Sequence, residues 1–265
     1  MGRIINPFAF ASSVNLGSRD FTLANSEYFT RSLANAVNPG NSDFWFSIWC
    51  YFDSIPSGGG NNRGLAASWS KVSDLGDRCW LCNAVNVTGS NPIIRVMLRD
   101  AADSANTTFD HSTNISASTW YHVFWYHDSV NNEVGIALNG GSFETSGYSG
   151  GVNTGSITPF LIGWTNSGGN GEYMDGQLLN LGFGQIPTGT MNSLAVTIKN
   201  AMYNSGNALY WEDITSTQKV DWGLTNGNGV WYPLNEENTG DDAIEKVAGL
   251  TATDVNTVGV SSNVP

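Results

Sequence analysis

Two aromatic runs constrain the fold of this chain more than any other feature of its sequence. They read FWFSIWCYF at 44–52 and WYHVFWYH at 120–127. Runs of this length, rich in aromatic and β-branched residues, are typical of strands that bury both faces. Shorter strand patterns recur between segments rich in Gly, Asn and Ser, at 93–99, 134–138, 160–164 and 177–183. We therefore expect an all-β protein.

The composition excludes several classes of protein. Only 13% of the 265 residues are charged, the formal net charge is -12, and 12% of the residues are aromatic. A disordered chain lacks so many aromatic residues, and a protein that binds duplex nucleic acid needs a basic surface to neutralise phosphates. We expect no nucleic-acid partner. We also expect no membrane insertion, because no stretch approaches about 18 consecutive apolar residues.

A single segment has helical periodicity. Met191, Leu194, Ile198 and Ala201 share one face of a helix, and Gly206 follows as a stop signal. The spacing of the strands and turns around it favours two antiparallel sheets packed face to face. We predict a jelly-roll β-sandwich with one short helix over an edge or corner.

The three cysteines do not form a disulfide framework, because their number is odd. Cys79 and Cys82 have the spacing of a redox motif, but no βαβ pattern follows them. A structural zinc site needs a second pair of Cys or His ligands, and none is visible. Cys79 and Cys82 are therefore predicted to be two packed or loop thiols.

Seven short segments occur in an informative order. They are ANSEYF (24–29), FSIW (46–49), STWYHV (118–123), ALNG (137–140), FLIGW (160–164), YMDGQL (173–178) and AMYNSG (201–206). Together they resemble the successive strands and the final helix of laminin-G-like domains in the concanavalin A-like lectin and glucanase superfamily. The resemblance covers most of residues 20 to 250 and implies the jelly-roll sandwich of that superfamily.

One departure from the family order is informative. GVWYPLNE (229–236) and AGLT (248–251) resemble the segment that usually opens such a domain, but here they lie near the C-terminus. This arrangement resembles the laminin-G-like proteins of tailed bacteriophages. We expect residues 230–255 to complete the sandwich within a single domain at 21–265. The alternative is that a neighbouring copy receives this segment by strand exchange.

Residues 1–20 precede the first segment of the resemblance. We expect them to form an N-terminal arm that docks on a capsid or on a neighbouring subunit. The alternative is a frayed terminus without a partner.

No catalytic constellation accompanies the fold. The E-x-D-x-x-E pattern of glucanases on this fold is absent, and GYSGG (147–151) lacks the strand-turn-helix context of a hydrolase elbow. His122 and His127 are five residues apart on one strand, so they face opposite sides of the sheet. We predict that the protein is not an enzyme.

Calcium is the one cofactor that the resemblance brings into consideration, because many related domains bind Ca²⁺ at a loop rim. Asp128, Asn131 and Asn132 fall in one turn, and Asn166, Asn170 and Asp175 fall near another. No calcium loop of fixed spacing is present, so we favour the alternative in which these residues form turns.

Aromatic residues beside polar loops are candidates for glycan contact, because rings and amides together suit small-ligand sites. The candidates are Trp164, Asn166, Tyr173 and Asp175, and Trp69 and Trp80 bracket a second variable region. Subunit contact is an equally good interpretation of Trp164 and Tyr173. A large aromatic residue within a strand usually fills the core, so core positions are predicted for Trp45, Trp49, Trp120 and Trp125.

The phage-type resemblance and the lack of catalytic residues predict a non-enzymatic structural protein of a virion. It would decorate the head or form part of a fibre or tail, and it would be made in the host cytoplasm without an export signal. Its partners would be capsid or tail proteins, copies of itself as a trimer, and cell-surface glycans. The alternative is a carbohydrate-binding adhesion lectin outside any capsid lattice, and a weaker one is a secreted lectin.

Overall fold

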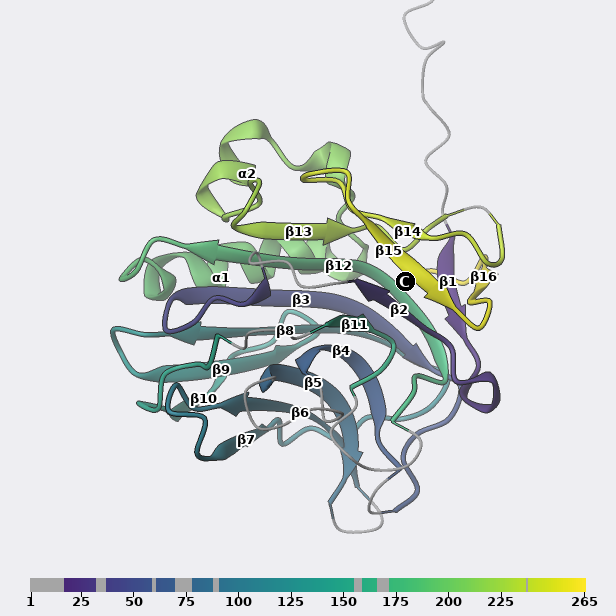
Figure 1. The fold of residues 1–265 in the computed structure, drawn as a ribbon, viewed down its shortest axis with the longest axis horizontal. Helices are drawn as coiled ribbons and strands as arrows, with labels where there is room; N and C mark the ends of the chain where they lie inside the picture. Colours follow the sequence, from purple (N-terminus) through teal and green to yellow (C-terminus); the bar gives the residue numbers. More distant parts are fainter. Residues whose placement is uncertain are drawn as a thin grey trace, which may run out of the picture.

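The computed structural model describes residues 17–31, 37–58, 61–69, 78–87, 91–154, 159–165, 172–236 and 238–265. Two antiparallel sheets pack face to face in this part of the chain (Figure 1). Sheet A has the order β10 (Glu144–Gly147), β9 (Glu133–Leu138), β8 (Trp120–Asp128), β3 (Asp43–Phe52), β12 (Gly176–Ile186), β1 (Ser18–Phe21) and β16 (Gly259–Ser261), and β13 (Gly229–Tyr232) also pairs with β12.

Sheet B forms the second layer of the sandwich. Its order is β14 (Ala243–Ile244), β15 (Thr251–Val255), β2 (Tyr28–Arg31), β11 (Phe160–Ile162), β4 (Arg63–Trp69), β5 (Arg78–Asn86), β6 (Pro92–Arg99) and β7 (Asn106–Asp110). The predicted jelly-roll β-sandwich is confirmed, and both aromatic runs are central strands of sheet A.

The main core lies between the sheets. Strand alternation turns Phe44, Phe46 and Ile48 inward from β3, while Trp45 faces the other side. Trp80 is fully buried, and its ring centroid lies 5.4 Å from that of Phe46. The three free cysteines are also buried, so Cys79 and Cys82 are packed thiols and not loop thiols.

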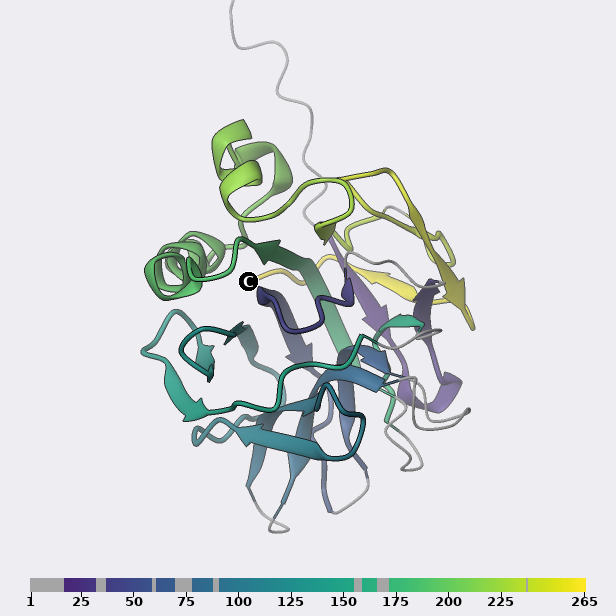
Figure 2. The ribbon, with the colours of Figure 1, turned by 60° about the vertical axis from the view of Figure 1, so that its left-hand side comes forward.

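A second core covers the outer face of sheet A. The predicted helix is present as α1 (Met191–Tyr203), which continues into η3 (Asn204–Gly206). It buries Met191 and Ile198 against Trp45, and it buries Leu194 and Ala201 in part. Figures 1 and 2 show α1 and α2 (Ser216–Asp221) on the same side of the molecule, outside the two sheets.

No sequence pattern predicted α2. It is six residues long, and a capping box between Thr215 and Gln218 begins it. The short 3-10 helices η1 (Leu23–Asn25) and η4 (Trp211–Asp213) were also not anticipated. None of the described helices is long and apolar enough to cross a bilayer.

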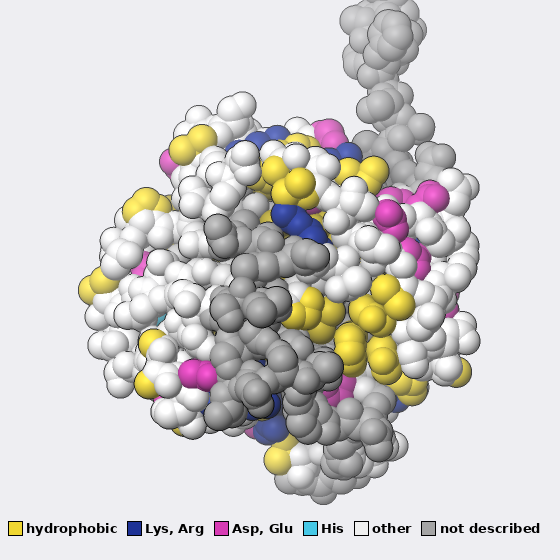
Figure 3. All heavy atoms as spheres, viewed as in Figure 1, with side chains coloured by type: hydrophobic (Ala, Val, Ile, Leu, Met, Phe, Trp, Pro, Cys, Tyr) yellow, Lys and Arg dark blue, Asp and Glu magenta, His cyan; other side chains and the backbone are white. Residues whose placement is uncertain are grey.

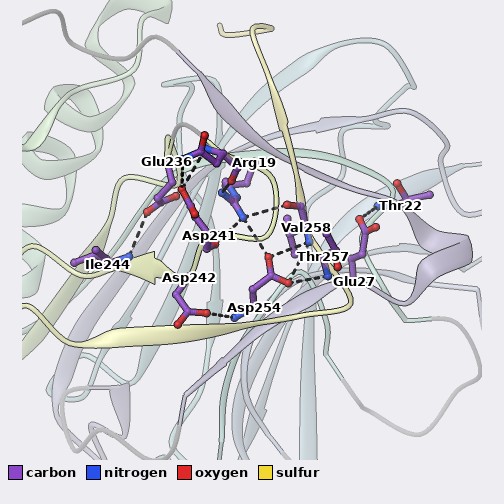
Figure 4. A network of polar contacts seen from close by, with 11 residues as sticks. Arg19, Thr22, Glu27, Glu236, Asp241, Asp242, Ile244, Asp254, Thr257 and Val258 are labelled. Carbon is purple, nitrogen blue, oxygen red and sulfur yellow. Dashed lines mark hydrogen bonds and ion pairs between the residues drawn. The ribbon is translucent and has the colours of Figure 1, made fainter.

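The C-terminal segment adds strands to both sheets of its own chain. β13 pairs with β12 and β16 pairs with β1 in sheet A, while β15 pairs with β2 in sheet B. The side chain of Arg19 on β1 is fully buried among these strands. Figure 4 shows it pointing toward Asp241, Asp254 and Val258.

The expected N-terminal arm overlaps the first strand. β1 begins at Ser18, and Arg19 and Asp20 pair with residues of both β12 and β16. Residues 18–20 of the expected arm thus lie in β1, and the ANSEYF motif marks β2 and not the strand before it. Residues 1–16 of the arm lie outside the described residues.

Candidate functional site

Three aromatic side chains meet on the outer face of sheet B. Trp164 follows β11 and Tyr173 precedes β12, and an isolated antiparallel bridge pairs the two residues. Their rings stack with centroids 5.2 Å apart and planes 12° apart. Tyr28 of β2 completes the group, with its ring centroid 4.8 Å from that of Trp164. We call these three residues the aromatic patch.

A buried apolar layer supports the aromatic patch. Leu161 pairs with Ala67, and Ala67 pairs with Leu81, so a row of side chains crosses β11, β4 and β5. Trp69 joins this row, and Trp164 and Tyr28 pack against it. The patch therefore rests on regular strands, and such strands hold a binding surface more rigidly than loops do.

Gly64 of β4 lies against the backbone of the two segments that form the Trp164–Tyr173 bridge. Its amide N–H donates to the carbonyl oxygen of Glu172 over 3.1 Å. A Cβ at this position would lie 2.5 Å from that oxygen and 2.7 Å from the amide nitrogen of Thr165. Only glycine lets β4 approach the two segments that carry Trp164 and Tyr173 so closely.

The three rings of the patch are partly exposed. Figure 3 shows hydrophobic side chains gathered on the face where β2 and β11 lie. Burial raises the pKa of Tyr28, and the neighbouring Tyr173 adds to this effect. The exposed ring surface is available to a ligand that has apolar faces.

Both carboxylate oxygens of Asp175 accept hydrogen bonds from other parts of the chain. Its Oδ1 accepts a hydrogen bond from the amide of Leu23 at 3.3 Å, and its Oδ2 accepts one from the Ser54 hydroxyl. Arg63 donates to the same hydroxyl at 2.9 Å. The structure thus brings Trp164 and Tyr173 together and engages the Asp175 carboxylate elsewhere. Asn166 and Asn170 lie outside the described residues.

The other calcium candidates form a turn. Asp128 Oδ1 accepts hydrogen bonds from the amides of Val130 and Asn131 at 3.0 and 2.9 Å, and its Oδ2 accepts one from Asn131 Nδ2 at 2.7 Å. Asn132 has a left-handed backbone with φ 52°. These contacts fit the favoured turn-forming alternative, and calcium binding stays the less favoured hypothesis. Among the described residues, no group of three His, Cys, Asp or Glu could hold a metal ion.

The predicted core tryptophans are mostly confirmed. Trp45, Trp49 and Trp125 are buried, but Trp120, the first residue of β8, is partly exposed. The two tryptophans of the second variable region are also buried, Trp69 beneath the aromatic patch and Trp80 in the main core. Neither offers an open ring face.

Tyr28 is a site residue that was not predicted from the sequence. Tyr28 lies in the ANSEYF segment, which was interpreted only as a strand. The signal that could have found it is the alternation along β2. Phe29 faces the core, so Tyr28 faces outward.

The two strand histidines face opposite sides of sheet A, as predicted. His122 Nε2 lies 2.8 Å from the Ser47 hydroxyl on the outer side, whereas the His127 ring packs against Phe44 of the main core. Burial, with a smaller effect of Lys199, lowers the pKa of His122 to about 3. His122 is therefore a neutral packed group.

No family model and no curated protein matches this sequence. Solved structures do match. A candidate carbohydrate-binding protein from Bacteroides ovatus has a TM-score of 0.61 at 14% identity, over 92% of this chain and 59% of that one. This chain thus spans about three fifths of the Bacteroides ovatus protein.

Two further matches are more distant. A heptameric SAP-like pentraxin from Limulus polyphemus has a TM-score of 0.47 at 14% identity, over 65% of this chain and 77% of that one. Domains LG4-5 of the mouse laminin alpha1 chain have a TM-score of 0.45 at 12% identity, over 63% of this chain and 40% of that one. The match to the Bacteroides ovatus protein shows the fold alone, and the predicted bacteriophage type stays a prediction.

Proposed function

We propose that this chain is a carbohydrate-binding domain of the lectin type and that the aromatic patch holds the sugar. The stacked pair of Trp164 and Tyr173, with Tyr28 beside it, carries the proposal. Partly exposed rings on a rigid sheet suit the apolar faces of a pyranose ring. The Bacteroides ovatus protein of the same fold, described as a candidate carbohydrate-binding protein, supports the same role.

The charge of the whole chain favours neutral glycans. Asp and Glu number 23 against 11 Lys and Arg, so the formal net charge is -12. A negative field of this kind disfavours anionic sugars such as sialic acids and uronic acids. We therefore expect neutral hexoses in the ligand.

A glycan array followed by calorimetry tests this function. We expect binding to neutral glycans, and Trp164→Ala should weaken it by about tenfold or more, which corresponds to about 1.4 kcal/mol. Trp211→Ala is the matched control, since Trp211 is also partly exposed. Trp211 lies in η4, far along the chain from the patch, and the Lys219 ammonium of α2 lies over its ring.

Two results would contradict the proposal. One is the absence of binding to any neutral glycan on the array. The other is a Trp164→Ala variant that binds as the wild type does but has a different molar mass in solution. The second result would assign the patch to subunit contact instead.

A place in a virus particle is a further proposal, which rests on the order of the laminin-G-like motifs. It is compatible with sugar binding, because a particle can carry a lectin-like domain on its head, fibre or tail. The capsid or tail partners and the trimeric state belong to this proposal. Mass spectrometry of purified particles tests it, and absence of the chain from every particle would contradict it.

A further inference from the structure

A second aromatic recess lies on the outer face of sheet A. It has a volume of about 330 Å³. Its lining includes Trp49, Trp120, Asn139, Tyr203, Val264 and Pro265. Trp49 belongs to a small buried cluster that is separate from the core between the sheets. We call this recess the aromatic pocket.

The floor of the aromatic pocket is held rigidly. Trp49 and Tyr203 stack with ring centroids 5.8 Å apart and planes 18° apart. Trp49 is only 3% exposed, and the buried ring of His122 packs against it with centroids 5.1 Å apart. Tyr203 lies directly over Gly140, where a Cβ would come within 2.3 Å of its ring. Both aromatic rings are therefore fixed before any ligand binds.

One wall of the pocket is tethered by Asn263. Trp120 Nε1 donates to Asn263 Oδ1 at 3.2 Å, and Asn263 Nδ2 donates to Gln177 Oε1 at 2.7 Å. The Ser18 hydroxyl donates to the Asn263 carbonyl oxygen at 2.7 Å. These three contacts bind Asn263 to β8, β12 and β1, and they hold the following Val264 and Pro265 against the pocket.

Asn139 supplies an oriented polar group. Its Oδ1 accepts a hydrogen bond from the amide of His122 at 2.9 Å, so the orientation of the side-chain amide is set. In the described part of the chain, no hydrogen bond engages its Nδ2. Two N–H donors are thus left for a ligand hydroxyl or ring oxygen. None of the residues that line the pocket is Asp, Glu, Lys, Arg or His within the described ranges.

We propose that the aromatic pocket is a second carbohydrate site, which takes one neutral hexopyranose. A volume of about 330 Å³ lies at the lower end of small-ligand pockets and suits one sugar ring. The sugar ring packs against the partly exposed rings of Trp120 and Tyr203 and accepts hydrogen bonds from Asn139. No cationic side chain lines the pocket among the described residues, so a carboxylate or sulfate would find no built-in partner there.

This second site makes the domain bivalent. The aromatic patch lies on the outer face of sheet B, and the aromatic pocket lies on the outer face of sheet A, with the sandwich between them. One chain can therefore bridge two glycans without forming an oligomer. The pocket shares no residue with the patch, so either proposal can fail while the other stands.

Tryptophan indole N–H signals in a ¹H–¹⁵N correlation spectrum test the pocket. The probes are methyl α-D-glucopyranoside, methyl α-D-mannopyranoside and methyl β-D-galactopyranoside, and single Trp→Phe variants assign the ten indole signals. We expect at least one probe to shift the signals of Trp49 and Trp120 saturably. Those shifts should persist in Trp164→Ala.

Asn139→Asp isolates the polar contact. Aspartate keeps an oxygen acceptor for the His122 amide and tolerates the left-handed backbone, but it removes both N–H donors and adds a negative charge. We expect the affinity for the probe to fall by about tenfold or more. Asn132→Asp is the matched control, because Asn132 is another left-handed turn residue that does not line the pocket.

The outcomes separate the two proposals. If the Trp164 signal shifts and those of Trp49 and Trp120 do not, the pocket inference is overturned and the proposed function stands. If only the pocket signals shift, the patch fails and the pocket stands. No shift of Trp49 or Trp120 with any probe at about 50 mM, which would fill a site with a millimolar Kd, also overturns the inference. Equal affinities of Asn139→Asp and the wild type overturn the assigned polar contact.

Discussion

Arg19 Nη2 lies 3.3 Å from Asp254 Oδ2, although 235 positions separate the two residues in the sequence. The same guanidinium donates to the carbonyl oxygens of Asn238, Asp241 and Val258. Burial lowers the pKa of Arg19, and the carboxylates of Glu236 and Asp254 oppose that shift. One buried charge thus joins the first strand to the C-terminal segment.

Arg19→Met should destabilise the fold strongly. The substitution leaves the Asp254 carboxylate with backbone donors only, and loss of one partner of a buried ion pair costs about 3–5 kcal/mol. Urea unfolding measures the loss. Arg95→Met is the control, because Arg95 and Asp110 form a partly exposed pair, for which about 0–1 kcal/mol is expected. Equal losses in the two variants would contradict a structural role for Arg19.

The long strands could be predicted from the sequence, and the strands that close the sandwich could not. β3 and β8 have nine or more residues, and their side-chain pattern decides the conformation locally. β1 and β16 have four and three residues, too few for a periodic signal. Their pairing depends on contacts across the whole chain, and Arg19 looks like any surface arginine until those contacts are known.

Two truncations should separate the N-terminal residues from the first strand. We expect deletion of residues 1–16 to leave the melting temperature unchanged, because β1 and its pairs with β12 and β16 remain. Deletion of residues 1–21 removes Arg19 and should lower the melting temperature sharply or prevent folding. Differential scanning calorimetry distinguishes the two. Equal melting temperatures would show that β1 does not contribute to stability.

Gly64→Ala should distort the aromatic patch. The added Cβ meets the backbone of Glu172 and Thr165, so the segments that carry Tyr173 and Trp164 must shift. Overpacking of this kind costs about 1–3 kcal/mol. We expect lower stability together with weaker glycan affinity.

The control for Gly64→Ala is Gly147→Ala. A Cβ at Gly147 meets nothing within 4 Å, so neither unfolding in urea nor glycan binding measured by calorimetry should change. If Gly64→Ala binds glycan as tightly as the wild type, the geometry of the Trp164–Tyr173 bridge is not important for binding.

The candidate site could be predicted only in part, for a physical reason. Trp164 and Tyr173 flank one loop, so their proximity follows from the chain itself. Tyr28 reaches them only because β2 pairs with β11, a pairing of strands about 130 positions apart. Asp175 has the residue type of a ligand contact, but the Ser54 hydroxyl and the Leu23 amide engage it. Residue type alone does not reveal such engagement.

His122 should make stability depend on pH in acid. Its pKa is about 3 in the folded protein and about 6.5 in an unfolded chain, so the unfolded state takes up the proton first as the pH falls. The stability that this neutral group contributes is present above about pH 6.5, and it is lost at about 1.4 kcal/mol per pH unit toward pH 3.

His122→Gln isolates this effect from that of the carboxylates. We expect the free energy of unfolding of the wild type to fall more steeply than that of the variant between about pH 6.5 and pH 4.5. His111→Gln is the comparison, since Glu144 opposes the lowering of the pKa of His111 by burial and the difference in slope should be smaller. Urea unfolding at each pH gives the slopes. Parallel curves for the wild type and His122→Gln would mean that His122 takes up its proton equally in both states, which its burial against Trp49 and Tyr203 opposes.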